Sequence, residues 1–150
     1  MKKFYEFIVV FFVFGLIGCY SEKFIDISNK EGYSKLIGKT YEITGPIIGH
    51  GIRKHSNAPV DYVTLMPPPG IGGHQIAFAN LVPIGSKIKI IKVLKSNRLI
   101  DSDITLIIEV YEGDFTSNVP IRIDLTRGNE GSKSTLLNEK FYRKIDNQRL

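Results

Sequence analysis

Residues 86–95 read SKIKIIKVLK, and lysine alternates with isoleucine over the first half of this stretch. Successive side chains of a β-strand point to opposite faces, so the spacing predicts a strand with one polar and one apolar face. The alternation shifts by one residue at Ile91, which follows the apolar Ile90. A β-bulge between Ile90 and Lys92 would keep the lysines on the outer face. We therefore expect a long strand here with one bulge near its middle.

Shorter segments with the same period-two pattern lie on both sides of this strand. The predicted strands are 39–44, with a possible continuation over 47–49, then 60–66, 75–79, 104–110 and 119–125. Residues 50–59 are polar and rich in turn formers, which predicts a loop. Many short strands separated by turns are typical of a small antiparallel barrel or sandwich. The expected fold class is therefore mainly β.

Two short helices are expected at the ends of the folded part. Ser28 and Glu31 have the spacing of a capping box, and Gly38 is a stop signal, which predicts a helix over 28–37. Near the C-terminus, apolar residues recur at helical spacing after Ser134 and Thr135, either of which could cap the helix. These apolar residues are Leu136, Leu137, Phe141, Tyr142 and Ile145.

Residues 81–90, read as LVPIGSKIKI, combine an apolar start, a short turn, a glycine, a small polar residue and an alternating strand. This step resembles one found in bacterial SH3-like domains, and the match covers about ten residues. The resemblance implies an SH3-like barrel. An OB-like five-stranded barrel is the alternative that we keep open, together with a sandwich.

The N-terminus contains an uncharged apolar run over 7–17, preceded by Lys2 and Lys3. The run is too short to span a membrane as a helix and suits the apolar core of a signal peptide. It closes on Leu16, Ile17, Gly18 and Cys19, which resembles the lipobox of bacterial lipoproteins. The resemblance implies cleavage before Cys19 and attachment of a diacylglyceryl group to its thiol.

This resemblance sets the expected organisation of the chain. We expect a signal peptide over 1–18, a lipidated tether over 19–27, one β-barrel domain over 28–145 and a frayed tail over 146–150. Cys19 is the only cysteine, so lipidation would leave no thiol for a disulfide. In the lipoprotein family Asp after the cysteine retains the protein in the inner membrane. Tyr20 in that position implies an outer-membrane anchor facing the periplasm, if the host has two membranes.

The formal net charge of +5 is modest, and the basic residues are scattered along the chain. Such a distribution is compatible with contact to anionic lipid head groups or glycans. Four lysines at positions 87, 89, 92 and 95 would share one outer strand face, where lysine also protects against aggregation. We expect no nucleic-acid partner.

The least regular stretch follows Met66 and is rich in proline and glycine. Its candidate partner-binding residues are Pro67, Pro68, Pro69, Gly70, Ile71, Gly72, Gly73 and His74. Prolines reduce the entropy lost on ordering, and glycines expose backbone, so the stretch fits a rigid recognition loop. The alternative is a hairpin connection that is stiff for purely structural reasons.

Signals for chemistry are few. His50, His55 and His74 could meet around a metal if their loops lie together, but no cysteine and no helical histidine pair supports them. We interpret them as solvated loop residues and expect no metal and no cofactor. The chain has no Gly-x-Ser-x-Gly motif, and its acidic residues lie in predicted loops or solvent faces. We therefore expect no enzyme activity.

The sequence thus predicts a lipid-anchored, non-catalytic β-domain that binds another envelope macromolecule. The first hypothesis is a protein partner, with the chain acting as a complex subunit, an assembly factor or a periplasmic inhibitor such as an immunity lipoprotein. The second is a peptidoglycan or other glycan, in line with the SH3-like resemblance. The third is a small hydrolase.

Overall fold

The computed structural model describes residues 22–97, 103–125 and 137–145. The expected signal peptide 1–18, the lipobox with Cys19 and the expected tail 146–150 lie outside these ranges. Residues 98–102 and 126–136 also lie outside them. Within the described ranges no helix has the length and hydropathy needed to cross a membrane.

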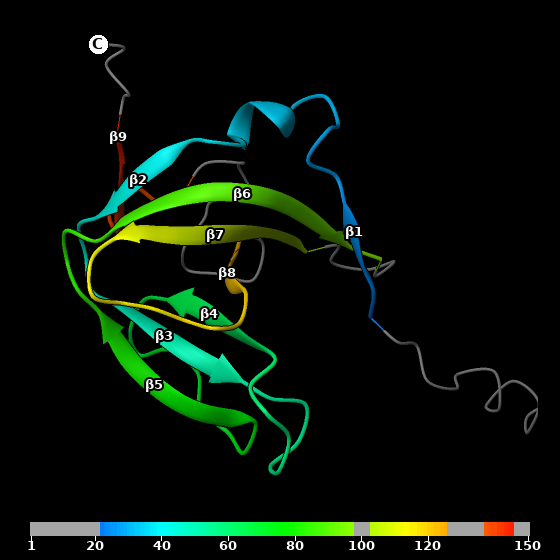
Figure 1. Ribbon diagram of the computed structural model, residues 1–150, viewed down its shortest axis with the longest axis vertical. Helices are drawn as coiled ribbons and strands as arrows, with labels where there is room; N and C mark the ends of the chain where they lie inside the picture. Colours follow the sequence, from blue (N-terminus) through cyan, green and yellow to red (C-terminus); the bar gives the residue numbers. More distant parts are fainter. Residues whose placement is uncertain (1–21, 98–102, 126–136, 146–150) are drawn as a thin grey trace, which may run out of the picture.

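The described residues form one nine-stranded sheet, which confirms the mainly β class (Figure 1). Its strands are β1 Phe24–Asp26, β2 Thr40–Ile43, β3 Ile47–Ile52, β4 Tyr62–Met66, β5 Ile76–Val82, β6 Lys87–Ser96, β7 Ile104–Glu112, β8 Ile121–Asp124 and β9 Tyr142–Ile145. The strand order is β5-β3-β4-β8-β7-β6-β2-β9, and β1 pairs with β6 beside this path. The sheet is open between β5 and β9.

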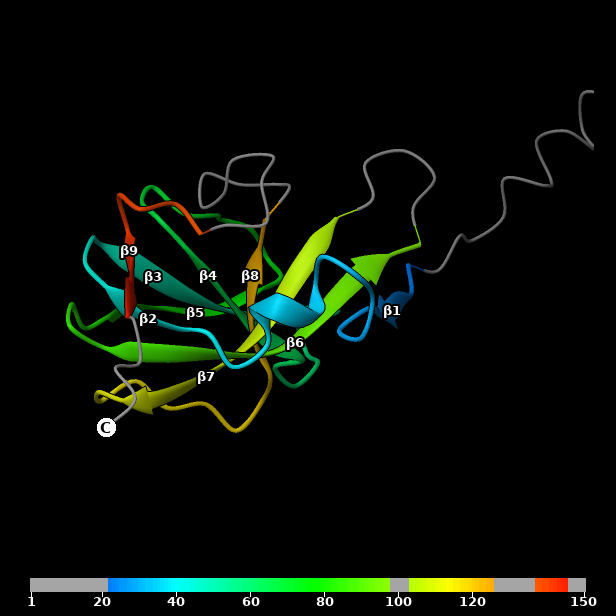
Figure 2. The same cartoon turned by 90° about the horizontal axis from the view of Figure 1, so that it is seen from above.

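The sheet is strongly curved. β2 and β3 lie near opposite ends of the strand order but are consecutive in the chain, so the two ends of the sheet must come close together. β2 pairs with β6 and β3 pairs with β5, although β2 and β3 follow each other directly. The backbone N–H of Ile43 donates to Ser86 O at 2.9 Å, and that of Gly85 donates to Ile43 O at 2.8 Å. These bonds continue the ladder across the bend between the two strand pairs. Figures 1 and 2 accordingly show β6 and β7 crossing over the layer of β3, β4 and β5.

The curvature encloses the hydrophobic core. Fully buried side chains come from both sides of the bend, namely Ile43, Ile47, Val63, Leu65, Ile88, Val93, Leu106 and Ile123. A sheet face can be buried only against another layer, and here the other layer is the same sheet. One pair departs from the expected antiparallel arrangement, because β4 and β8 run parallel, with Val63 opposite Ile121.

The predicted bulge in the longest strand is confirmed. The register between β6 and β7 shifts between Ile90 and Lys92, so that Ile90 pairs with Ile108 and Lys92 with Ile107. Ile91 is left with an exposed side chain, while Ile90 remains in the core. The extra residue at the bulge therefore lets the apolar side chains on both sides of it, Ile90 and Val93, point into the core.

The predicted helix over 28–37 is wrong. This segment forms turns and one short 3-10 helix, η1, over Ser34–Leu36. The Ser28 hydroxyl, expected to cap the helix, instead accepts the N–H of Val93 at 3.0 Å. Gly32 has φ 87°, a left-handed conformation that interrupts a right-handed helix. The buried Leu36 nevertheless holds the segment against the core.

The predicted C-terminal helix is also wrong over its described part, 137–145. Asn138 starts a single turn, in which its carbonyl accepts the N–H groups of Phe141 and Tyr142 at 2.9 and 3.0 Å. The chain then continues as β9, which pairs antiparallel with β2 from Tyr142 opposite Ile43 to Ile145 opposite Thr40. Pairing with the unsatisfied edge of β2 outweighs the helical spacing of the apolar residues.

The sheet begins earlier than expected, inside the stretch interpreted as the tether 19–27. Phe24 pairs with Ser96 and Asp26 with Leu94, which makes β1 an integral strand. Ile27, directly after β1, is buried in the core. A tether that ends before β1 is therefore shorter than the sequence indicated.

Candidate functional site

The proline- and glycine-rich loop connects β4 to β5 and folds back over the sheet. We call the side of β3, β4 and β8 that is turned away from the core the outer face. Gly70 lies against the His50 ring on this face, because a Cβ on Gly70 would lie 2.7 Å from His50 Cε1 and closer still to Nε2. Gly70 has φ 73°, and its N–H closes a turn with Pro67 O at 3.0 Å. The loop is therefore packed on the strands that precede it.

A groove of about 450 Å³ separates the rest of the loop from the outer face. It is lined mainly by apolar side chains from β3, β4, the loop and β5, with polar groups at a few points. The lining residues are Ile52, Tyr62, Thr64, Met66, Ile71, Gly72, Gly73, His74, Gln75, Ile76 and Asp124. Ile71 at the loop tip is 42% exposed, so an apolar side chain borders the entrance.

Hydrogen bonds from the neighbouring β3–β4 connection hold the loop. Arg53 donates from Nη2 to His74 O at 3.3 Å and from its backbone N–H to Gln75 O at 3.0 Å. The Gln75 side-chain amide donates to Lys54 O at 3.3 Å. The two loops thus meet at one end of the sheet, as a shared site would require.

A row of polar side chains crosses the outer face beside the groove. His50 on β3 lies opposite Thr64 on β4, and Thr64 lies opposite Arg122 on β8. His50 and Thr64 are buried, at 2% and 3% exposure. Both ring nitrogens of His50 and the hydroxyl of Thr64 lack a hydrogen-bond partner among the described residues. Buried polar atoms without partners are uncommon in folded proteins, so this row marks an unusual place.

His50 corrects the expectation of a solvated loop histidine. It belongs to β3, and burial lowers the pKa of its imidazole below the ordinary value of 6.5. The ring is therefore neutral at neutral pH. The polar sequence around His50 hid this strand, because Gly49 and Gly51 flank it and normally indicate a turn.

Both glycines lie on the core side of β3 and make room for aromatic rings. A Cβ on Gly49 would lie 2.5 Å from Phe115 Cζ, and a Cβ on Gly51 would lie 2.7 Å from Phe78 Cδ1. Close approach of a side chain is one reason for glycine inside a strand. These contacts explain why β3 tolerates two glycines.

Arg122 closes the row at β8 by stacking on aromatic rings. Its guanidinium carbon lies 3.9 Å from the centroid of Tyr62 and 5.1 Å from that of Phe24. Burial raises the pKa of the Tyr62 hydroxyl, and the positive charge of Arg122 opposes this rise. The stack links β1 to β4 and β8 and fixes the side wall of the groove.

A metal site is not formed by the residues that the structure places. Within the described ranges no three His, Cys, Asp or Glu side chains come together as ligands. His50 is buried under Gly70, whereas His74 contributes to the rim of the groove. The three histidines are therefore not gathered into one centre in this part of the chain.

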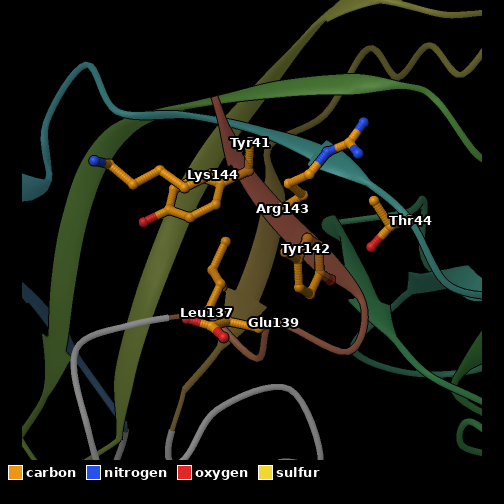
Figure 3. A pocket seen from close by; sticks show the side chains of 7 residues that line it. All are labelled: Tyr41, Thr44, Leu137, Glu139, Tyr142, Arg143 and Lys144. Atoms are coloured by element: carbon orange, nitrogen blue, oxygen red, sulfur yellow. The ribbon is translucent and has the colours of Figure 1, made fainter. Parts of the chain in front are cut away.

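A second cavity of about 470 Å³ lies between β2, β9 and the turn after Leu137 (Figure 3). Tyr41 and Lys144 are register partners and extend side by side, while Arg143 points away from them. Burial raises the pKa of the Tyr41 hydroxyl, and Lys144 opposes this rise. No local sequence pattern marks this cavity, because its lining comes from two segments far apart in the chain, 41–44 and 137–144.

No protein-family model, curated protein sequence or solved structure matches this chain. Function is therefore inferred from the residues of the chain itself. The groove under the proline- and glycine-rich loop is the candidate site that sequence and geometry share.

Proposed function

We propose that this protein is a lipid-anchored envelope lipoprotein and a non-catalytic binding module for another envelope protein. In this proposal the groove receives an apolar side chain of the partner. Pockets of a few hundred Å³ with apolar walls and few polar groups are typical binding sites. The apolar walls formed by Ile52, Met66 and Ile76, with Thr64 and Asp124 as polar points, fit that description.

The observation that carries the proposal is the packing of Gly70 on His50, which holds the loop over the groove. A preformed groove binds without the entropic cost of ordering a loop. The hydrogen bonds from Arg53 to His74 and Gln75 act in the same direction. A loop that served only as a connection would not need a glycine fitted against a buried ring.

The lipid anchor rests on the resemblance of Leu16, Ile17, Gly18 and Cys19 to a lipobox. One acyl chain binds a membrane only marginally, whereas a multiply acylated cysteine would anchor stably. Only residues 20–23 separate Cys19 from β1, so an acylated Cys19 would hold the sheet close to the membrane surface. With Tyr20 in the following position, we propose an outer-membrane anchor facing the periplasm in a host with two membranes.

We further propose that the curved sheet is a small, partly open barrel, SH3-like or alternatively OB-like. The continued ladder between Ile43 and Ser86 supports curling of the sheet into a barrel. Peptidoglycan binding is less well supported, because part of the positive charge on β6 is neutralised. Lys87 pairs with Glu112 at 2.6 Å, and Lys92 lies 3.5 Å from Asp26.

The binding proposal is tested with Ile71→Asp, which places a charge at the entrance of the groove. Ile91→Asp is the matched control, because Ile91 is similarly exposed, at 45% against 42%, and lies on the bulge of β6. Both variants are produced in the native host, solubilised in detergent and used to capture cross-linked envelope proteins. We expect Ile71→Asp to lose a partner that the wild type and Ile91→Asp retain. Equal capture by both folded variants would remove the groove as the binding site.

The anchor is tested separately by Cys19→Ala. We expect this variant to accumulate as an unprocessed or mislocalised precursor, as judged by mass spectrometry and membrane fractionation. A correctly cleaved and firmly membrane-bound Cys19→Ala protein would contradict lipidation at this residue.

A further inference from the structure

β5 forms one end of the sheet and pairs only with β3 in the part of the chain that the structure describes. Its seven residues, IAFANLV, contain no charge and no proline. The two most exposed large apolar side chains of the described residues are Leu81 in β5, at 71%, and Ile84 just after it, at 67%. Figure 1 shows β5 at the margin of the molecule.

An unpaired strand edge presents free backbone donors and acceptors, and proteins usually protect such edges with charges, proline or a very short strand. The opposite end of the sheet, β9, follows this rule with Arg143 and Lys144 in a strand of four residues. β5 has no charge and no proline and is seven residues long, and its one irregularity, a register shift against β3, lies at its start, between Ile76 and Phe78. Its edge is therefore suited to pair with another strand.

The regular part of β5 is complementary to itself. The register with β3 shifts between Gly51 and Ile52, which leaves Phe78–Val82 as the regular segment. An antiparallel pair of two such segments centred on Asn80 places Ala79 opposite Leu81 and Phe78 opposite Val82. Each small or medium side chain then faces a larger one, and no like charges meet across the pair.

The geometry points to pairing of β5 with β5 of a second copy of this chain. The two sheets join across a two-fold axis at Asn80, where each copy presents the same surface. Leu81 of each copy packs over Ala79 of the other. A strand from a different protein is the competing occupant, and the experiment below distinguishes it.

The pair is expected to be weak. Stable complexes bury about 1,200–2,000 Å² in total, and one pair of short edge strands buries less. Confinement to a membrane raises the effective concentration of such a pair. The pairing itself does not depend on the anchor or on the groove, so it stands or falls independently of the proposed function. A covalent trap is the suitable measurement, because it accumulates a transient dimer.

The full chain carrying Cys19→Ala is purified in detergent and given one new cysteine at a time. Residues directly opposite in an antiparallel pair have Cα atoms about 4.5–5.5 Å apart, within the range for a disulfide. We expect Asn80→Cys to shift from the monomer band to a disulfide-linked dimer under mild oxidation. Leu81→Cys is the matched control, because the two copies of residue 81 would be about 8 Å apart, too far for a disulfide.

A mixture of Ala79→Cys and Leu81→Cys chains tests the register without changing Asn80. We expect the mixture to form the mixed dimer in preference to either homodimer. Three results would overturn self-pairing. They are no dimer from Asn80→Cys, equal cross-linking of Asn80→Cys and Leu81→Cys, or a disulfide to a different protein in oxidised cell membranes. The membrane experiment uses Asn80→Cys in a chain that keeps Cys19, and the chain with native Asn80 is its control.

Discussion

Gly70→Ala is predicted to destabilise the fold more than any other alanine substitution in the proline- and glycine-rich loop. An L-residue in the left-handed conformation of Gly70 costs about 1–2 kcal/mol. The added Cβ would also overlap the buried His50 ring, and overpacking of this kind costs about 1–3 kcal/mol. We expect a total loss of about 2–5 kcal/mol in the free energy of unfolding.

Gly72→Ala is the matched control in the same loop. No heavy atom lies within 4 Å of a Cβ placed there, and Gly72 does not have a left-handed φ. Surface substitutions without such features usually change stability by less than about 0.5 kcal/mol. Urea unfolding of both variants at neutral pH measures the difference, provided that the dependence on denaturant is unchanged.

The steric part of the loss is isolated by a double-mutant cycle with His50→Ala. Removing the ring makes room for the Cβ on Gly70, so the double variant should be more stable than the sum of the single changes predicts. We expect a coupling energy of about 1–3 kcal/mol. Additive losses, or equal unfolding midpoints for Gly70→Ala and Gly72→Ala, would refute the packing of the loop on His50.

Two further predictions concern the polar row. Because burial lowers the pKa of His50, the unfolded chain takes up a proton near pH 6.5 before the folded protein does. Stability is therefore full above pH 6.5 and falls as the pH drops towards the folded pKa, by at most about 1.4 kcal/mol per pH unit. In urea unfolding measured at several pH values, His50→Leu should weaken the dependence of the free energy of unfolding on pH. An unchanged dependence on pH in this variant would contradict the lowered pKa of His50. Arg122→Lys should lose about 0.5–1 kcal/mol by weakening the stack on Tyr62, whereas Tyr62→Phe, which keeps a ring, should lose less. Equal losses would contradict the stack.

The sequence was sufficient to predict those parts of the fold that depend only on the alternation of polar and apolar side chains. The bulge between Ile90 and Lys92 followed from a single shift in an otherwise regular pattern. The mainly β class followed from the same periodicity. The helix predicted from the capping-box pattern at Ser28 does not form. The Ser28 hydroxyl instead accepts a hydrogen bond from the N–H of Val93, and a local sequence pattern cannot reveal a partner so far along the chain.

The candidate site was predictable only in part. Proline and glycine content identified the loop after Met66, but not the groove beneath it. That groove depends on Gly70 meeting His50 and on Asp124 from a strand much later in the chain. The glycines on both sides of His50 indicated a turn, although His50 lies in a buried strand. Glycine occurs at these two positions because the rings of Phe115 and Phe78 pack against them, and both rings come from later parts of the chain.

The joining of β2 to β9 and of β4 to β8 bears on the time course of folding. Tyr41 pairs with Lys144 and Val63 pairs with Ile121, so these strand pairs join segments that are far apart in the sequence. Proteins dominated by such long-range contacts fold slowly, commonly over about milliseconds to seconds. The sheet cannot be completed until β9 has been synthesised. A chain of this kind therefore stays unfolded for longer than a helical one of similar length, and only an unfolded polypeptide can pass through a narrow channel.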